Sequence, residues 1–181
     1  MKKTVFLLSL ALGFSGMAAA QSLPKVAGSP SYPTTTIVDV TTHSPNHTAL
    51  ATAIQASGLS FKLQEPGPFT FFAPTNDAFG KLPSGTLENL VQSGKQPLLA
   101  QMLNGLLVPG RLAAIDLARA VQEGGGSVAL KTLNGTNLTV TLDGSILKLT
   151  DESGATSRLT QVDLYQKNGI VHVVDGVFMP K

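Results

Sequence analysis

Apolar side chains follow a helical period in the front half of the chain and a period of two in the back half. From residue 46 onward, Leu50, Ala53 and Ile54 recur at helical spacing, and Gly58 suits the position just after a helix end. The same spacing predicts further short helices over residues 87–92 and 97–104. We therefore expect the front half to be mainly helical.

Strict alternation of apolar and polar positions begins near residue 137. Leu138, Val140 and Leu142 are separated by polar residues, and Asn-Gly and Asp-Gly pairs at residues 134–135 and 143–144 favour tight hairpin turns. Further strands are predicted over residues 146–150, 158–164 and 170–177, the last apolar on both faces and therefore central in its sheet. Helices followed by an antiparallel meander indicate an α+β domain.

The boundary between one strand and the next helix has a specific pattern. Residues 69–73 form a dense aromatic run that Pro74 ends. Thr75 can then cap a helix by accepting from the backbone N–H of Asp77 or Ala78, and Asp77 suits the positive end of the helix dipole. A strand is expected to turn directly into a short helix here.

The first 35 residues differ from the rest of the chain. Residues 1–20 combine two lysines, an apolar run of about ten residues and a final Ala-Ala-Ala, which is typical of a secretory signal peptide and too short to span a bilayer. Residues 21–35 are rich in Pro, Ser and Thr and predict a flexible leader. The folded domain is expected over residues 36–181, and the mature protein in the extracellular space, at the cell surface or in the periplasm.

Composition and charge exclude several classes of function. The chain has no Cys, so disulfides and thiolate chemistry are excluded. Without Lys2 and Lys3 of the predicted signal peptide, the basic side chains are equal in number to the 11 acidic ones, and Trp is absent. A nucleic-acid partner therefore has no electrostatic or stacking support.

No pattern of residues indicates catalysis or a cofactor. His43 and His47 have i, i+4 spacing, but Pro45 interrupts any helix between them, so a surface loop is expected instead of a metal site. Residues 124–126, Gly-Gly-Gly, lack the Lys and Ser/Thr of a phosphate loop and predict a flexible turn. Asp151 and Glu152 predict a solvated turn and do not form a calcium loop. We expect a protein that is not an enzyme and binds no metal or cofactor.

Two separated segments resemble the signature motifs of the fasciclin domain. They span residues 70–79, TFFAPTNDAF, and 168–175, NGIVHVVD, and three shorter segments at residues 36–40, 56–59 and 108–110 follow the family order. The resemblance covers residues 36–180. It implies a wedge of two β-sheets with helices packed on the N-terminal side.

Most motif residues have a structural interpretation. The motif comprises Thr70, Phe71, Phe72, Ala73, Pro74, Thr75, Asn76, Phe79, Asn168, Gly169, His172 and Asp175. The aromatic residues are expected in the core and Thr75 at a helix start. For His172, a hydrogen-bonded core position is favoured over a role as a ligand or base, because its strand is apolar.

The resemblance implies a role in adhesion, with contacts to a cell-surface or matrix protein or a polysaccharide. Many fasciclin domains carry a Tyr-His pair linked to integrin-type binding just before the Val-Pro-Gly segment, but Gly105 and Leu106 stand there in this chain. That form of recognition is therefore not carried over. We expect a secreted, non-catalytic adhesion or matrix-interaction module.

A leucine-rich segment leaves a second function open. Its apolar side chains cover about half of a helix circumference and are Leu98, Leu99, Met102, Leu103, Leu106 and Leu107. Core packing is the favoured interpretation. The alternative is an exposed apolar strip for self-association, or for carrying a small apolar ligand such as a pigment or lipid.

Overall fold

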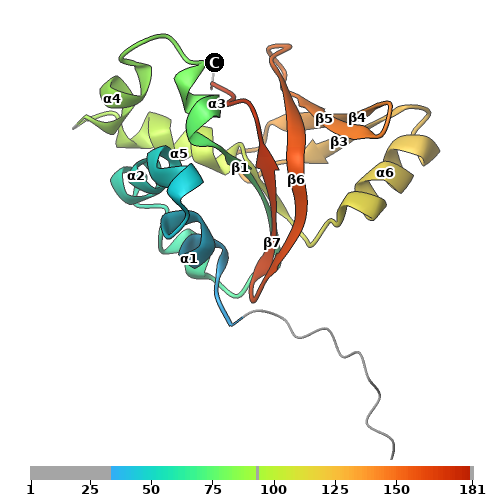
Figure 1. Cartoon of the computed structure of the whole chain (residues 1–181), viewed down its shortest axis with the longest axis horizontal. Helices are drawn as coiled ribbons and strands as arrows, with labels where there is room; N and C mark the ends of the chain where they lie inside the picture. The colour runs from blue at the N-terminus through green and yellow to red at the C-terminus, as the bar shows by residue number, and fades with distance from the viewer. Residues whose placement is uncertain (1–33, 93, 180–181) are drawn as a thin grey trace, which may run out of the picture. The chain divides into compact units, whose positions relative to one another are not determined.

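The computed structural model describes residues 34–92 and 94–179 (Figure 1). The predicted signal peptide, and all of the predicted leader except its last two residues, lie outside the described residues. The helices are α1 (Ile37–Thr42), α2 (Thr48–Ser57), α3 (Asn76–Gly80), α4 (Thr86–Val91), α5 (Gln96–Asn104) and α6 (Ala114–Glu123), with 3-10 turns at Pro45–His47 and Lys62–Gln64. The strands are β1 (Phe69–Pro74), β2 (Leu107–Pro109), β3 (Ser127–Lys131), β4 (Asn137–Asp143), β5 (Ile146–Thr150), β6 (Thr156–Gln166) and β7 (Gly169–Val174).

The strands are hydrogen-bonded in the order β2-β1-β7-β6-β5-β4-β3. β3 to β7 follow one another as an antiparallel meander. The part from β4 to β7 was predicted from the sequence, whereas β3 was not. β7 lies between β1 and β6 and is buried along its whole length, which confirms its expected central position. It ends at Val174 and not at residue 177, because at Asp175 the side-chain Oδ1, and not the backbone carbonyl, accepts from the N–H of Arg158 in β6.

The expected wedge of two sheets is present as two arms that share β6. The start of β6 pairs with β5 through residues 156–158, whereas residues 159–166 pair with β7. Two register shifts between Leu159 and Leu164 interrupt the ladder with β7. Bulges of this kind bend a strand and increase its twist, which allows one strand to serve both arms.

Helices α1 to α5 gather on one side of the β1–β7 arm, and α6 lies beside β3, β4 and β5 (Figure 1). The α+β fold with helices on the N-terminal side is therefore confirmed. Buried apolar side chains from the helices and from both arms form one continuous core, which includes Leu50, Phe71, Leu103 and Val140.

α6 was not predicted from the sequence, although Leu117 and Val121 have the spacing of a buried helix face. Its N-cap residue, Ala113, has no polar side chain to accept from the first backbone amides. Asp163 of β6 accepts from the N–H of Ala114 at 2.8 Å instead. The three glycines after α6 end the helix with backbone bonds from Gly124 and Gly126 to its last turn, so the expected flexible turn is a hydrogen-bonded helix end.

Candidate functional site

The two signature motifs are joined in the centre of the sheet. β1 and β7 pair in parallel and in register from Phe69 opposite Gly169 to Pro74 opposite Val174. Both strands are buried along their entire length. Segments about a hundred positions apart therefore form one unit, and Gly169 is required within it because a Cβ there would clash with the carbonyl oxygen of Phe69.

The turn from β1 into α3 matches the capping prediction. Thr75 is the N-cap residue of α3, and its hydroxyl accepts from the N–H of Ala78 at 3.2 Å. Its own N–H donates to the carbonyl of Val174 at 3.2 Å, which ties the cap to the end of β7. Phe79 is buried one turn later, as expected for a core aromatic.

Asn76 joins this turn to the start of α2. Its Oδ1 accepts from the N–H of Ala49 at 3.0 Å and from the hydroxyl of Thr48 at 3.1 Å. Its Nδ2 donates to the carbonyl of Pro45 at 2.9 Å. The N-cap position of α2 is His47, which makes no side-chain capping bond, so Asn76 supplies the acceptor from another segment.

Asn168 has the same role at the other end of the β1–β7 pair. This side chain is buried, and its Oδ1 accepts from the N–H of Ile37 at 3.0 Å. Its Nδ2 donates to the carbonyls of Leu63 at 2.6 Å and Glu65 at 2.9 Å. One amide therefore satisfies three buried or partly buried backbone groups in two distant segments.

Thr70 and His172 hold the segment that follows β2. The Thr70 hydroxyl donates to the carbonyl of Gly110 at 2.8 Å and accepts from the N–H of Leu112 at 2.9 Å. Nε2 of His172 lies 2.8 Å from the carbonyl of Leu112. Both anchoring side chains are fully buried.

His172 is a neutral imidazole fixed at both nitrogens. The N–H of Asp163 donates to Nδ1 at 3.2 Å, so Nδ1 is unprotonated. Nε2 therefore carries the proton and donates a hydrogen bond to the carbonyl of Leu112. Burial lowers the pKa of His172, while the Leu112 carbonyl and the Asp163 carboxylate act in the opposite direction. The expectation of a hydrogen-bonded core histidine is confirmed.

Asp175 closes the second motif at the start of β6. Its Oδ1 accepts from the N–H of Arg158 at 2.7 Å and from the hydroxyl of Ser157 at 3.2 Å. Partial burial raises the pKa of Asp175, but the bond from Arg158 and the charge of Lys81 outweigh it, and the pKa lies below its ordinary value. The side chain is an ionised acceptor held in a fixed position.

The alternative of an exposed leucine-rich strip is wrong for five of its six residues. Leu99, Met102, Leu103, Leu106 and Leu107 are at most 2% exposed, because α5 packs on α2 and α4 and continues into β2. Leu98 is 38% exposed and stands alone among the six. Core packing, the favoured interpretation of this segment, is confirmed.

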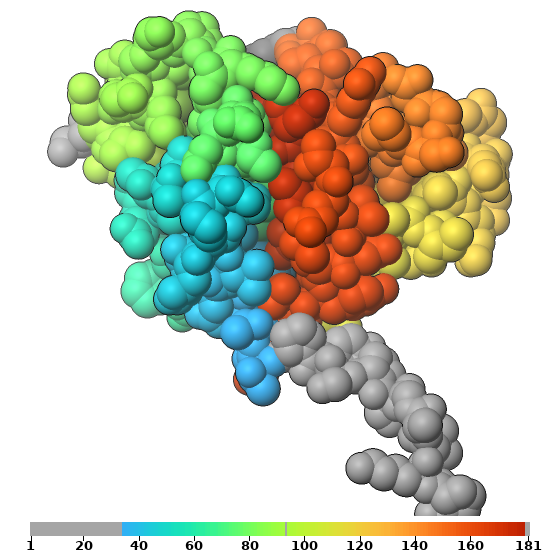
Figure 2. All heavy atoms as spheres, in the orientation of Figure 1, coloured from blue at the N-terminus to red at the C-terminus, as the bar shows by residue number. Residues whose placement is uncertain are grey.

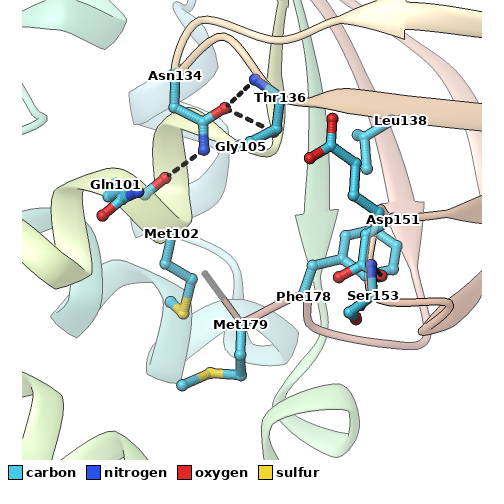
Figure 3. Close-up of a pocket in the computed structure, with 11 residues that line it drawn as sticks. Gln101, Met102, Gly105, Asn134, Thr136, Leu138, Asp151, Ser153, Phe178 and Met179 are labelled. Atoms are coloured by element: carbon cyan, nitrogen blue, oxygen red, sulfur yellow. Dashed lines mark hydrogen bonds between the residues drawn. The ribbon is translucent and has the colours of Figure 1, made fainter. Parts of the chain in front are cut away.

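A small cavity of about 130 Å³ lies beside the end of α5 (Figure 3). Met102, Phe178 and Met179 supply its apolar side, and Asp151 and Ser153 lie near the ring of Phe178. Asn134 closes another side by donating to the carbonyl of Gln101 at 3.1 Å and accepting from the N–H of Thr136 at 3.1 Å. A void of this size accommodates a group about as large as a benzene ring.

The two histidines near α2 lie in different environments. His43 is exposed, but His47 is buried, which corrects the expectation that both lie in a surface loop. Nδ1 of His47 lies 2.9 Å from the Ser44 hydroxyl, and burial lowers the pKa of His47. In the part of the chain that the structure describes, no three His, Asp or Glu side chains converge as a metal site.

Comparison with known proteins agrees with the paired motifs. A family model of the fasciclin domain matches residues 45–180 of this chain. The chain belongs to the fasciclin domain family. In this fasciclin domain, the polar side chains of the two signature segments mainly join and cap distant parts of the backbone.

Relatives of this fasciclin domain occur in bacteria and animals. The uncharacterized protein sll1735 of Synechocystis sp. is 35% identical over 146 residues, which cover 79% of this chain and 96% of that protein. Protein sll1483 of the same organism is 34% identical over 145 residues, covering 80% and 73% of the two chains. The transforming growth factor-beta-induced protein ig-h3 of Sus scrofa is 32% identical over 153 residues, which cover 82% of this chain but only 20% of ig-h3.

The fold is also similar to that of the FAS1 domain pair from the insect cell adhesion molecule Fasciclin I. The TM-score is 0.72 at 21% identity, and the match covers 82% of this chain. This fasciclin domain spans about half of that chain, which holds two domains.

Proposed function

We propose that this protein is a secreted, non-catalytic adhesion or matrix-interaction module. The observation that carries the proposal is the use of the motif's polar side chains. Thr70, Asn76, Asn168 and His172 direct their hydrogen bonds to backbone groups of other segments. A catalytic group must reach a substrate, whereas these groups hold the scaffold together.

The proposed location rests on the pattern of residues 1–20. Cleavage after Ala20 would leave a mature chain that begins at Gln21. Among the described residues, no helix has the length and apolar character needed to cross a bilayer. Amino-terminal sequencing of the protein from a secreting host tests this proposal, and a retained Met1 would contradict it.

The adhesion proposal is supported by the fold shared with an insect cell adhesion molecule. The mature protein should be retained on at least one of three fractions: cell envelope, polysaccharide and exopolymer. An unrelated secreted domain of neutral charge serves as the control. Retention no stronger than this control on all three fractions would refute the proposal.

A second function is kept because of the cavity beside α5. Met102, Phe178 and Met179 give it an apolar wall, and its volume of about 130 Å³ limits the ligand to a small group or to one end of a longer molecule. The protein purified from its host should then carry extractable lipid or visible absorbance. A colourless, lipid-free preparation that takes up neither class of ligand would remove this alternative.

A further inference from the structure

A larger hollow, of about 420 Å³, lies between α3, the start of β6 and the segment after β7. In Figure 2, the green segment that contains α3 lies beside the red and orange C-terminal strands. We call this hollow the α3–β6 cleft, and its lining includes Lys81, Leu82, Ser157, Arg158, Asp175 and Val177. Its volume falls in the range of roughly 300–1,000 Å³ that is common for ligand sites.

Asp175 supplies a fixed acceptor in this cleft. The backbone N–H of Arg158 and the hydroxyl of Ser157 both donate to its Oδ1. Its Oδ2 has a looser partner, Nζ of Lys81 at 3.6 Å. Oδ2 is therefore oriented by the protein and can accept a hydrogen bond from a ligand without loss of the bonds that hold the carboxylate.

Lys81 and Arg158 supply donors on either side of that acceptor. Their side chains are 62% and 56% exposed. Arg158 also lies 3.4 Å from the carboxylate of Asp143, so two cations and two carboxylates balance one another around the cleft. Exposed carboxylate pairs of this kind are held weakly, and ligand groups can replace them at little cost. Lys81 stays at the cleft when its pair is replaced, because its Nζ also donates to the backbone carbonyl of Asp175 at 2.6 Å.

Leu82 and Val177 are half-buried and supply the apolar part of the cleft surface, beside the polar Thr156. A sugar ring matches this arrangement because its C–H groups can lie on an apolar surface while its hydroxyls both donate and accept. An acidic chain would approach the carboxylates of Asp175 and Asp143, and a basic chain would approach Lys81 and Arg158. The charge balance therefore favours an uncharged ligand.

The geometry points to the α3–β6 cleft as a binding site for a neutral polysaccharide. This inference rests on the proposed adhesion function and names its partner class. Asp175 accepts from sugar hydroxyls, Lys81 and Arg158 donate to them, and the apolar residues contact the ring.

The test measures retention of the mature protein on immobilised dextran, mannan, galactan and laminarin, with heparin as the acidic comparator. Retention is expected on at least one neutral polysaccharide, with little change between low and high salt, and weak retention on heparin. Lys81→Ala and Arg158→Ala should each weaken the binding about tenfold. Lys62→Ala is the matched control, because Lys62 has a similarly exposed pair with Glu65 at 2.8 Å and does not line the cleft.

Three results would overturn the inference. They are the absence of retention on all four neutral polysaccharides, stronger retention on heparin that high salt abolishes, and equal binding by the wild type and both cleft variants. If an alanine variant does not fold, Lys81→Gln and Arg158→Gln replace it. Retention on an envelope fraction without binding to any neutral polysaccharide would refute the cleft site and leave the adhesion function standing.

Discussion

Phe72 and His172 face each other across the parallel pair of β1 and β7, with ring centroids 5.7 Å apart and ring planes at 25°. Each residue belongs to a different signature motif. The stacked rings lie in the core, and His172 also bonds to backbone groups of Asp163 and Leu112. One residue pair therefore links both motifs to β6 and to the segment after β2.

The capping of α3 predicts an order of stabilities. Thr75→Ala removes the acceptor for the Ala78 amide and should cost about 0.5–2 kcal/mol. Thr75→Ser keeps the acceptor and should be nearly neutral, whereas Phe79→Ala opens a cavity in the core and should cost roughly 3–5 kcal/mol. Urea denaturation measures all three. Unchanged stability of Thr75→Ala together with lost partner binding would show that Thr75 is a contact residue.

The close approach of β1 and β7 predicts opposite effects at two glycines. In Gly169→Ala, the new Cβ would clash with the Phe69 carbonyl and lie 2.7 Å from Cδ1 of Ile37, so we expect a loss of roughly 3 kcal/mol or more. Gly80→Ala is the control, because a Cβ there meets no atom within 4 Å. Gly80→Ala should be neutral or slightly stabilising by thermal unfolding. Equal stability of the two variants would contradict the register of the pair.

The buried side-chain amide of Asn168 should contribute more to the free energy of unfolding than a single hydrogen bond at the surface. Asn168→Ala leaves the N–H of Ile37 and the carbonyls of Leu63 and Glu65 without this partner, and we expect a loss of roughly 3 kcal/mol. Asn89→Ala, at an exposed helical position, is the matched control and should change stability by less than about 0.5 kcal/mol. The two variants are compared by their free energies of unfolding, measured in urea titrations. A small effect at both positions would mean that these bonds do not hold the segments together.

Stability should fall as the pH falls below about 6.5. The pKa of His172 is lower in the folded protein than its ordinary value of 6.5, so the unfolded chain takes up a proton that the folded protein does not. The contribution of neutral His172 to the free energy of unfolding is complete above the pKa of this histidine in the unfolded chain. It is lost as the pH decreases toward the pKa in the folded protein, by at most about 1.4 kcal/mol per pH unit for each such histidine. The shifted aspartates, Asp39 and Asp175, titrate at lower pH and act below this window.

The histidine contribution can be isolated with one variant. Between about pH 7.5 and 5.5, His172→Gln should lose less free energy of unfolding than the wild type. Part of the slope should remain, because burial also lowers the pKa of His47. Identical slopes for wild type and variant would show that His172 does not titrate differently in the folded and unfolded states.

The sequence by itself determined the features that depend on neighbouring residues. Alternation over residues 137–142 defined β4, and Pro74 followed by Thr75 marked the end of β1 and the cap of α3. These signals act within a few residues, since a strand face has a period of two and a capping side chain bonds to an amide two or three positions away. The two motifs also identified the family without showing how they meet.

Only the tertiary structure decided the features that join distant segments. α2 and α6 begin without a capping side chain of their own and receive acceptors from Asn76 and Asp163. Apolar spacing in α5 showed that one helix face is covered. The packing of α2 and α4 against α5 determined that, of the six residues in the leucine-rich segment, only Leu98 is exposed. The α3–β6 cleft brings together Lys81 from the end of α3, Arg158 from β6 and Asp175 from the segment after β7. The local periodicity of the sequence does not predict these contacts between distant segments, because they depend on how the helices and strands pack around a common core.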